Sequence, residues 1–536
     1  MDLLLRNARV YTVDPARPWA EAVAIDGERI VWVGNDDDAP EAADTIDLGG
    51  RLLLPGFVDA HNHVRLGSDR NAVSLRNART HEEVRSAIEV YAAEHPDHEW
   101  VVGEEWSYAA APQGRPPRSE DLDGVAAGKP VMVLSYDVHN VWLNTEAMRR
   151  FGLSRDTPEL PFGRSEIDDA GEPTGYLHDF AVMGLSRAGH AMLTEHVRPN
   201  FAPESQYRRL FSSLDMAIGF GITTVVEPQN SVDDLPLFER ARAEGRLRSR
   251  LIAALFHPRG TTADELDEFE AAKRRFGDDR FRVAPIKLYI DDVVEPHTAA
   301  LFEPYADAPE TRGDTFYPPE EFAEVITELE RRGFQTFTHA IGDRGIRTAL
   351  DAIEAARRAN GPADRRHQLV HVEIVQPEDL GRFGELGVVA CMQPRHAAPD
   401  IADVWRVAVG REREAYALPW RSLAAAGATL AFSSDWNVAE MDPLVGIYSA
   451  VTRADLRGND AWAEQETVDL PTAISAYTIG SAYANFADGD RGSITPGKYA
   501  DLVALSQNLF EIEPSEFLET RAELVLTGGE IHLRGL

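Results

Sequence analysis

The sequence predicts an α/β protein whose main domain is a TIM-like (β/α)8 barrel, accompanied by a small β-sandwich domain built from both ends of the chain. Three observations predict this architecture. Apolar strand candidates alternate with helical segments between residues 53 and 489, as they do in parallel α/β barrels. Eight such strands can be counted, which is the number that closes a barrel. Alternating β segments also occur outside this region, at residues 1–52 and 490–536.

The two ends of the chain have the character of one composite β domain. Residues 3–13 and 22–34 alternate apolar and polar positions, and Asp26-Gly27 supplies a hairpin turn. The same alternation returns near the other end of the chain, at residues 499–505 and 522–526. We therefore expect residues 1–52 and 490–536 to form a single domain.

The strands of the barrel are predicted in order along the chain. The first strand ends at His61, and amphipathic helical segments separate the later strands. The stretch from Arg65 to about Phe220 is too long for a plain connection, so we predict an inserted subdomain at about 65–220 that forms a lid or faces the substrate. The seven further strand candidates are 221–227, 251–256, 286–290, 334–339, 368–371, 388–393 and 430–435.

Candidate metal ligands stand at the ends of these strands. His61 and His63 are spaced i and i+2, so both can point at one ion from the same face of a strand. Two polar residues facing solvent would be the simpler interpretation, but three later strands also end in histidine or aspartate. The carboxyl ends of barrel strands meet at one mouth. We therefore expect His61, His63, Lys287, His339, His371 and Asp435 to converge on a metal such as zinc.

Composition narrows the class of partner. The 536 residues include 54 basic and 89 acidic side chains, a formal net charge of −35, which argues against nucleic acid or an anionic membrane as a partner. A single cysteine, Cys391, excludes an internal disulfide, and no apolar run approaches the roughly 18 residues of a membrane helix. We expect a cytoplasmic protein that acts on a small molecule. A homodimer is left open.

Motifs along nearly the whole chain resemble one known family. The chain is similar to the metal-dependent amidohydrolase superfamily, in particular to its YtcJ-like branch, amidohydrolase family 3, which includes N-substituted formamide deformylases. The motifs occur in the order of that family. They are LLPGFVDAHNHV at 53–64, GITTVVE at 221–227, IKLYIDDVVEPHTAAL at 286–301, THAIGDRG at 338–345, LVHVEIV at 369–375, MQPRH at 392–396, SSDWNVAEMDPL at 433–444 and GSITPGKYADLVAL at 492–505.

The resemblance implies a barrel with a urease-like β-sandwich and one or two divalent metals, most often zinc. It places His61, His63, His339, His371 and Asp435 in the metal chemistry. The implied reaction is hydrolysis of a non-peptide C–N bond, in an amide, a formamide or a cyclic amide. Metal-activated water attacks the carbonyl, Asp435 moves the proton, and His339 and His371 complete the catalytic set.

Lys287 has two interpretations. In related binuclear enzymes, a lysine at the end of the fourth strand reacts with carbon dioxide, and its carbamate bridges two metals. The resemblance therefore implies N6-carboxylysine at Lys287. The alternative is an ordinary lysine that pairs with Asp291 or Asp292 at the mouth of the barrel.

Further residues are expected to contact the substrate, although each has a structural alternative. Gln393 and His396 follow the seventh strand, whereas the aromatic residues of the insertion could equally form its core. The predicted substrate-binding set is Trp106 and His139 in the insertion, Tyr289, Asp291 and His297 after the fourth strand, Gln393 after the seventh, and Trp436 beside Asp435.

Two other functions are compatible with the same fold. A hydrolytic deaminase of a heterocyclic amine would resemble this chain, but such enzymes place a glutamate three residues after the histidine of the fifth strand. That position is Gly342 here. A catalytically inactive binding or scaffold protein should have lost ligands, and none of the expected ligands is missing.

Overall fold

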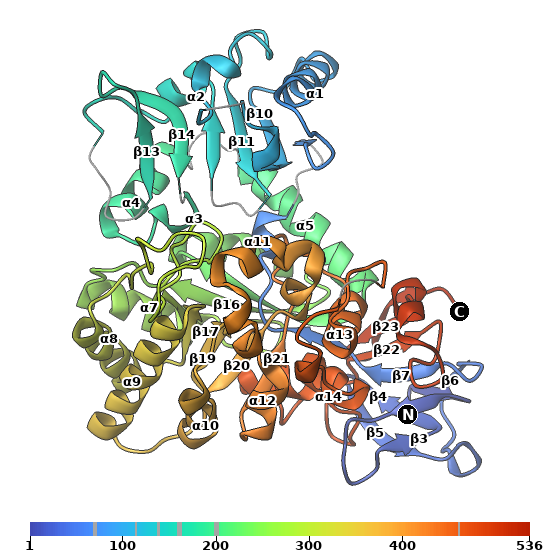
Figure 1. Ribbon diagram of the computed structural model, residues 1–536. Helices are drawn as coiled ribbons and strands as arrows, with labels where there is room; N and C mark the ends of the chain where they lie inside the picture. Colours follow the sequence, from blue (N-terminus) through green and yellow to red (C-terminus); the bar gives the residue numbers. More distant parts are fainter. Residues whose placement is uncertain are drawn as a thin grey trace. The chain divides into compact units, whose positions relative to one another are not determined.

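The computed structural model describes residues 1–536 apart from 68–71, 113–114, 137–139, 158–162, 179, 198–202 and 459–460. The chain divides into two compact units (Figure 1). The first unit consists of Met1–Val64, Ser213–Phe256 and Asp267–Leu536, and the second consists of Arg65–Ser212 and His257–Leu266. In the described part of the chain, no helix is both long enough and apolar enough to cross a membrane.

The first unit contains the predicted barrel. Eight parallel strands pair in chain order, and each is one of the strands expected from the sequence. Their bounds are β8 Phe57–Asp59, β15 Ile222–Asn230, β16 Arg250–Phe256, β17 Phe281–Tyr289, β18 Thr336–Ala340, β19 Gln368–His371, β20 Val389–Met392 and β21 Thr429–Phe432. The fold class is therefore confirmed.

Backbone hydrogen bonds beyond the first and eighth strands bring the two edges of this sheet together. The amide of Asp435 donates to the carbonyl of His61 at 2.9 Å, and the amide of His63 donates to the carbonyl of Trp436 at 2.6 Å. Small and apolar side chains fill the interior, including Ala60, Ala254 and Phe337, none of which is exposed. The residues after β8 and β21 are thereby held side by side.

Helices follow the strands as the alternating pattern predicts. In α9, Asp343–Asn360, buried apolar residues recur at helical spacing, and the helix ends at Gly361, whose φ of +85° favours glycine. The other helices of this region are α6 Leu235–Ala243, α7 Ala263–Arg275, α8 Pro319–Arg331, α10 Pro377–Leu386, α11 Pro399–Val409, α12 Trp420–Ala425, α13 Pro443–Thr452, α14 Leu470–Ser475 and α15 Ser481–Ala484.

Strands from both ends of the chain form the β-sandwich of the first unit. One sheet has the order β5-β4-β1-β6, and the other has the order β24-β23-β22-β7-β2-β3. Apolar residues of both sheets, such as Leu5, Val23, Leu53 and Leu502, share one core. The bounds are β1 Leu3–Arg6, β2 Arg9–Tyr11, β3 Trp19–Ala20, β4 Ala22–Asp26, β5 Arg29–Gly34, β6 Asp44–Asp47, β7 Leu52–Pro55, β22 Leu502–Leu505, β23 Ala522–Thr527 and β24 Glu530–Arg534.

The second unit has a mixed sheet of its own, with the order β13-β14-β12-β11-β10-β9. Two apolar clusters support this sheet, one around Trp106 and Trp142 and the other around Phe151. Its strands are β9 Val73–Ser74, β10 Val101–Trp106, β11 Val131–Ser135, β12 Val141–Leu143, β13 Arg164–Ile167 and β14 Pro173–His178. Its helices are α1 His81–Glu94, α2 Thr145–Arg150, α3 Phe180–Met183 and α4 Arg187–Met192, and α5 Pro203–Gly219 leads from this unit to β15.

Candidate active site

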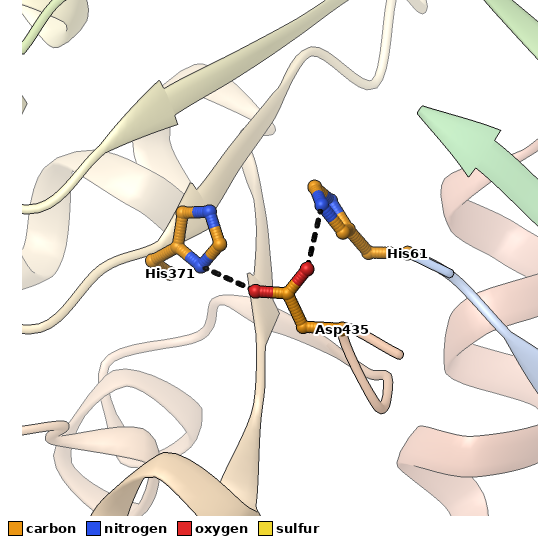
Figure 2. Close-up of side chains that lie close together, drawn as sticks. All are labelled: His61, His371 and Asp435. Carbon is orange, nitrogen blue, oxygen red and sulfur yellow. Dashed lines mark ion pairs between the residues drawn. The ribbon is translucent and has the colours of Figure 1, made fainter. Parts of the chain in front are cut away.

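The carboxylate of Asp435 is surrounded by histidines from the ends of barrel strands. Its Oδ1 lies 3.2 Å from His61 Nε2 and 3.3 Å from His63 Nε2. Its Oδ2 lies 3.8 Å from His371 Nδ1 and 3.7 Å from His396 Nε2. Figure 2 shows His61 and His371 on two sides of this carboxylate. One imidazole at the end of β19 and three that follow β8 or β20 thus meet one carboxylate that follows β21.

A second buried aspartate brings the first and eighth strands into register. The carboxylate of Asp59 accepts hydrogen bonds from the amide of Ser434 at 3.0 Å and from its hydroxyl at 2.6 Å. It also accepts a hydrogen bond of 2.9 Å from the side chain of Asn62. Burial raises the pKa of Asp59 to about 6. Asp59 therefore fixes the backbone on either side of His61 and Asp435.

The backbone turns sharply at two members of the cluster. The φ angles of His371 and Asp435 are +75° and +56°. Such left-handed conformations of residues with a Cβ cost about 1–3 kcal/mol and persist where the surrounding structure determines them. These turns at the strand ends direct the side chains of His371 and Asp435 into the cluster.

The charge states of the cluster match those of metal ligands. Burial lowers the pKa of His61 to about 3 and lowers the pKa of His371 far below its ordinary value, so both imidazoles are neutral. Burial alone would raise the pKa of Asp435, but its interactions with His61 and His63 hold that pKa well below the ordinary value. Neutral imidazoles and an ionised carboxylate are the forms that bind metal.

The donor atoms are also close enough to share an ion. One ligand atom from each of His61, His371 and Asp435 lies within 4.8 Å of the other two, and all three residues are buried. The Nε2 atoms of His61 and His63 are 3.3 Å apart. Removing so many polar atoms from water without a further partner would be costly. The cluster therefore fits a divalent metal.

His339 stands beside this cluster at the end of β18. Its ring centroid lies 4.5 Å from that of His371. The ring also stacks on Tyr289, with the two centroids 4.8 Å apart. The hydroxyl of Tyr289 donates to Gln229 Oε1 at 2.6 Å. Gln229 lies near the end of β15 and was not predicted from the sequence. A single glutamine in a strand forms no motif that would indicate a functional site.

Lys287 is fully buried on β17. Its Nζ has no hydrogen-bond partner among the described residues and lies 4.7 Å from the ring centroid of Tyr289 and 5.2 Å from that of Phe337. Burial lowers the pKa of Lys287 to about 8, although the charges of Asp435 and Glu227 oppose this shift. At pH 7 roughly a tenth of the amine is therefore neutral, far more than for an ordinary lysine. The structure shows no ion pair between Lys287 and Asp291 or Asp292 in the described residues.

Gln393 orients His371. Its Oε1 lies 2.8 Å from His371 Nδ1, and its Nε2 donates to the hydroxyl of Ser433 at 2.8 Å. Because a carbonyl oxygen only accepts, Nδ1 of His371 carries the proton and Nε2 keeps its lone pair. From the sequence, Gln393 is expected to contact the substrate. The structure places it fully buried and bonded on both sides.

His396 links the cluster to a buried glutamate. Its Nδ1 lies 3.8 Å from Glu373 Oε1, and the other oxygen of Glu373 accepts a hydrogen bond of 2.8 Å from the indole of Trp405. Burial lowers the pKa of His396, but the bond to Glu373 and the charge of Asp435 outweigh it and raise the pKa above its ordinary value. Glu373 was missed in the sequence, where only its place two residues after His371 could have indicated it.

The remaining predicted substrate contacts lie in varied surroundings. Asp291 is fully buried, and its oxygens accept backbone hydrogen bonds from Ala300, Ile341 and Gly342 at 2.8–3.0 Å. His297 is 30% exposed and pairs with Asp307 at 2.9 Å. These bonds hold loops together, and neither side chain belongs to the Asp435 cluster.

Trp436 and the insertion complete the predicted set. Trp436 is partly buried, and its indole nitrogen has no hydrogen-bond partner among the described residues. Trp106 is fully buried in the core of the second unit, where its ring packs at 5.5 Å from Trp142. His139 lies outside the described residues.

Comparisons with known proteins agree with this geometry. Residues 44–532 match the amidohydrolase family. The chain is 27% identical to a putative amidohydrolase YtcJ of Bacillus subtilis, over 99% of both chains. It is 28% identical to an N-substituted formamide deformylase of Arthrobacter pascens, over 97% of this chain and 96% of that protein.

A solved structure supports the fold in the same way. An uncharacterized metal-dependent hydrolase from Pyrococcus horikoshii superimposes with a TM-score of 0.77 at 22% identity, covering 99% of each chain. The resemblance expected from the sequence motifs is thus confirmed. The chain belongs to the amidohydrolase family and is a metal-dependent hydrolase that acts on C–N bonds.

Proposed function

We propose that the protein hydrolyses the amide bond of a small N-substituted amide, with formamides as the first class to test and zinc as the metal. The observation that carries this proposal is the meeting of His61, His63, His371 and His396 around the carboxylate of Asp435. Similarity to an N-substituted formamide deformylase supports the choice of substrate class.

We assign the metal to the strand-end ligands His61, His63, His339, His371 and Asp435. Neutral imidazoles suit zinc, which takes nitrogen and oxygen donors. A bound zinc ion supplies Lewis acidity toward water and toward the scissile carbonyl. Gln393 keeps the ring of His371 in one tautomer, as hydrogen-bonded neighbours of metal-binding histidines do.

Asp435 moves the proton in this mechanism. As the water oxygen attacks the carbonyl carbon, a carboxylate oxygen of Asp435 accepts the proton that the water loses. The C–N bond then breaks, and Asp435 returns the proton to the leaving nitrogen, which leaves as an amine. His396, whose Nε2 lies 3.7 Å from Oδ2 of Asp435, is placed to donate to an oxyanion beside this carboxylate.

We propose that Lys287 carries an N6-carboxyl group. Its neutral amine attacks carbon dioxide, forms an N–C bond and releases one proton, which gives a carbamate with two ligand oxygens. The buried Nζ without a hydrogen-bond partner in the described residues and the pKa of about 8 support this reaction. Two metals would then be bound in place of one.

The carbamate can be tested by substitution and rescue. Lys287→Ala should lose bound metal and activity, and acetate or another short carboxylate should partly restore both. Lys287→Arg is the matched control, because it keeps a cation and cannot form the carbamate. An unmodified amine at Lys287 in a fully metal-loaded crystal structure would contradict this proposal.

Tyr289 and Trp436 are the residues that we propose to contact the substrate. Both are partly buried beside the cluster, and Trp436 offers an indole N–H without a partner among the described residues. Tyr289→Phe removes only the hydroxyl that donates to Gln229. It should raise KM with little change in the metal content.

A substrate screen tests the proposed function directly. Zinc-loaded protein is offered matched series of N-formyl, N-acyl, lactam and carbamate compounds, with Asp435→Asn protein as the blank. We expect the highest kcat/KM on an N-formyl compound. Turnover of cyclic or long-chain amides with none of formamides would contradict the formamide class, and release of ammonia from heterocyclic amines alone would identify a deaminase.

A further inference from the structure

A cavity lies at the opposite end of the barrel strands from Asp435. It has a volume of about 390 Å³, within the range of small-molecule sites. We call it the basal cavity. Its lining comes from the end of α7, the start of β17, the segments before β18 and β19, and the residues after α15, and includes Lys273, Arg282, Gln335, Arg365, Asn485 and Phe486.

The basal cavity is separate from the candidate active site. Arg282 is the second residue of β17, and Tyr289, which borders the His339 ring, is the last. Seven residues of extended strand at about 3.3 Å each span roughly 23 Å. A ligand in the basal cavity therefore cannot contact the Asp435 cluster.

Three cations line this cavity in a strongly acidic protein. Lys273, Arg282 and Arg365 face one lining carboxylate, that of Asp364, which gives a local charge of 3 − 1 = +2 in a chain of net −35. Asp364 is already engaged, because both of its oxygens accept hydrogen bonds of 3.1 Å from Arg366. Among the residues that line the cavity, no second carboxylate balances the excess positive charge.

Among the described residues, none of the three cations has a carboxylate partner closer than 3.9 Å. Lys273 donates to the carbonyl of Gly333 at 2.8 Å, and Arg282 donates to the carbonyl of Asn485. Neither forms an ion pair in the described part of the chain. Arg365 approaches Glu330 only at 3.9 Å, and its buried Nε has no hydrogen-bond partner there. Cations so placed favour an anion beside them.

The pKa values agree with a site that lacks its counter-charge. Burial lowers the pKa of Lys273, and the charge of Arg365 lowers it further, against the charge of Glu270. Burial also lowers the pKa of Arg282, against the charges of Asp279 and Asp490. A bound anion would raise both pKa values.

Polar and apolar groups in the cavity define the rest of the ligand. Gln335 and Asn485 are 6% and 2% exposed, and the side-chain oxygen of each has no hydrogen-bond partner among the described residues. They offer acceptors for hydroxyl groups. Phe486, which is 45% exposed, and Val283 add apolar surface.

We propose that the basal cavity binds a small dianionic oxyanion, either inorganic phosphate or the phosphate or dicarboxylate group of a hydroxylated metabolite. The three cations supply charge-assisted hydrogen bonds, and the amide oxygens of Gln335 and Asn485 accept hydrogen bonds from hydroxyl groups of the ligand. This site does not depend on the proposed substrate.

Calorimetric titration of the zinc-loaded full-length protein tests the proposal. Inorganic phosphate, a phosphate monoester such as AMP, and succinate are titrated separately, which distinguishes the free ion from the two organic sources. We expect saturable binding of at least one of them, with one ligand per chain. Lys273→Gln and Arg365→Gln should each weaken it about tenfold, since each removes one charge-assisted hydrogen bond.

Matched controls separate this site from general charge effects and from the active site. Arg274 is the neighbour of Lys273 on α7, is 70% exposed and does not line the cavity, so Arg274→Gln should leave affinity unchanged. Asp435→Asn should also leave it unchanged, and Lys273→Gln should keep normal hydrolytic turnover. Absence of saturable binding, or loss of binding in Asp435→Asn, would overturn the proposal.

A measurement on the unsubstituted protein covers the case in which a variant fails to fold. Hydrogen–deuterium exchange with and without the bound anion should show new protection at residues 273–286 and 333–336. Protection confined to residues 61–63 and 435–437 would place the anion in the active site and contradict the basal site.

Discussion

Asp435 and Asp291 are both buried aspartates that follow barrel strands, yet their surroundings differ completely. Asp435 lies after β21 among four imidazoles, at 3.2–3.8 Å from their nitrogens. Asp291 lies after β17, and its oxygens accept hydrogen bonds from three backbone amides. The first carboxylate has partners that can share a metal, whereas the second has partners that fix a loop.

The difference also appears in their pKa values. For Asp435, interactions with His61 and His63 outweigh the effect of burial and hold the pKa well below the ordinary value. For Asp291, burial outweighs the three amide bonds and raises the pKa to about 7. Burial and position at a strand end are common to both residues, so only their partners identify the functional carboxylate.

The two aspartates should differ most in their effect on kcat. Asp435→Asn should lower kcat by about 10²–10⁴-fold, as loss of a general base does, with little change in the free energy of unfolding. Steady-state kinetics on a confirmed substrate and denaturant unfolding measure the two quantities. A kcat within a few-fold of the unsubstituted protein would leave Asp435 only a structural ligand.

Substitution of Gln393 tests whether this residue orients His371 beside Asp435. Gln393→Ala removes the acceptor for His371 Nδ1 and should lower metal affinity or turnover by about 10–100-fold, as loss of such supporting groups does. Gln393→Glu keeps an acceptor oxygen at the same place and should recover most of the loss. Equal defects in both variants would argue for a packing effect instead of orientation of His371.

Asp291→Asn should show the opposite behaviour to Asp435→Asn. Its amide group would turn N–H donors toward backbone N–H groups, which should lower the free energy of unfolding by about 1–3 kcal/mol. Metal content should be retained, and kcat should change by less than tenfold. Loss of stoichiometric metal in this variant would contradict a purely structural role for Asp291.

A difference in pH dependence should also distinguish the two aspartates. The folded pKa of Asp291, about 7, lies above the ordinary value of 3.8, so the folded state binds the proton more tightly than the unfolded state. The stability contributed by Asp291 is therefore fully present below about pH 4 and is lost as the pH rises through 7. Unfolding of the unsubstituted protein and Asp291→Asn across pH 4–8 measures this slope, and a difference that grows with pH would contradict it.

The sequence predicted the barrel because eight short apolar runs alternate with helical segments along the chain. The eight strands and the two-ended β-sandwich needed only alternation and turn residues such as Asp26-Gly27. His61, His63 and His371 were predicted to lie beside Asp435 because each stands at a strand end and the barrel brings strand ends together.

Partners distant in the chain could not be predicted in the same way. Asp291 follows a strand just as Asp435 does, and only the folded loops around Ala300 and Ile341 show which groups its oxygens meet. Gln393 and Glu373 each act on a histidine through a contact that depends on the register of neighbouring strands. The Trp106 side chain belongs to the core of the insertion, which aromatic content alone does not distinguish from a substrate pocket.

The metal content of purified protein decides whether the Asp435 cluster is a metal site. Elemental analysis after thorough dialysis should find about one or two zinc ions per chain in the unsubstituted protein and in the control His297→Ala. The double substitution His61→Ala with His371→Ala should remove that metal together with activity. No stoichiometric divalent metal in the unsubstituted protein, with no gain of activity on adding zinc, would contradict a metal site at the Asp435 cluster.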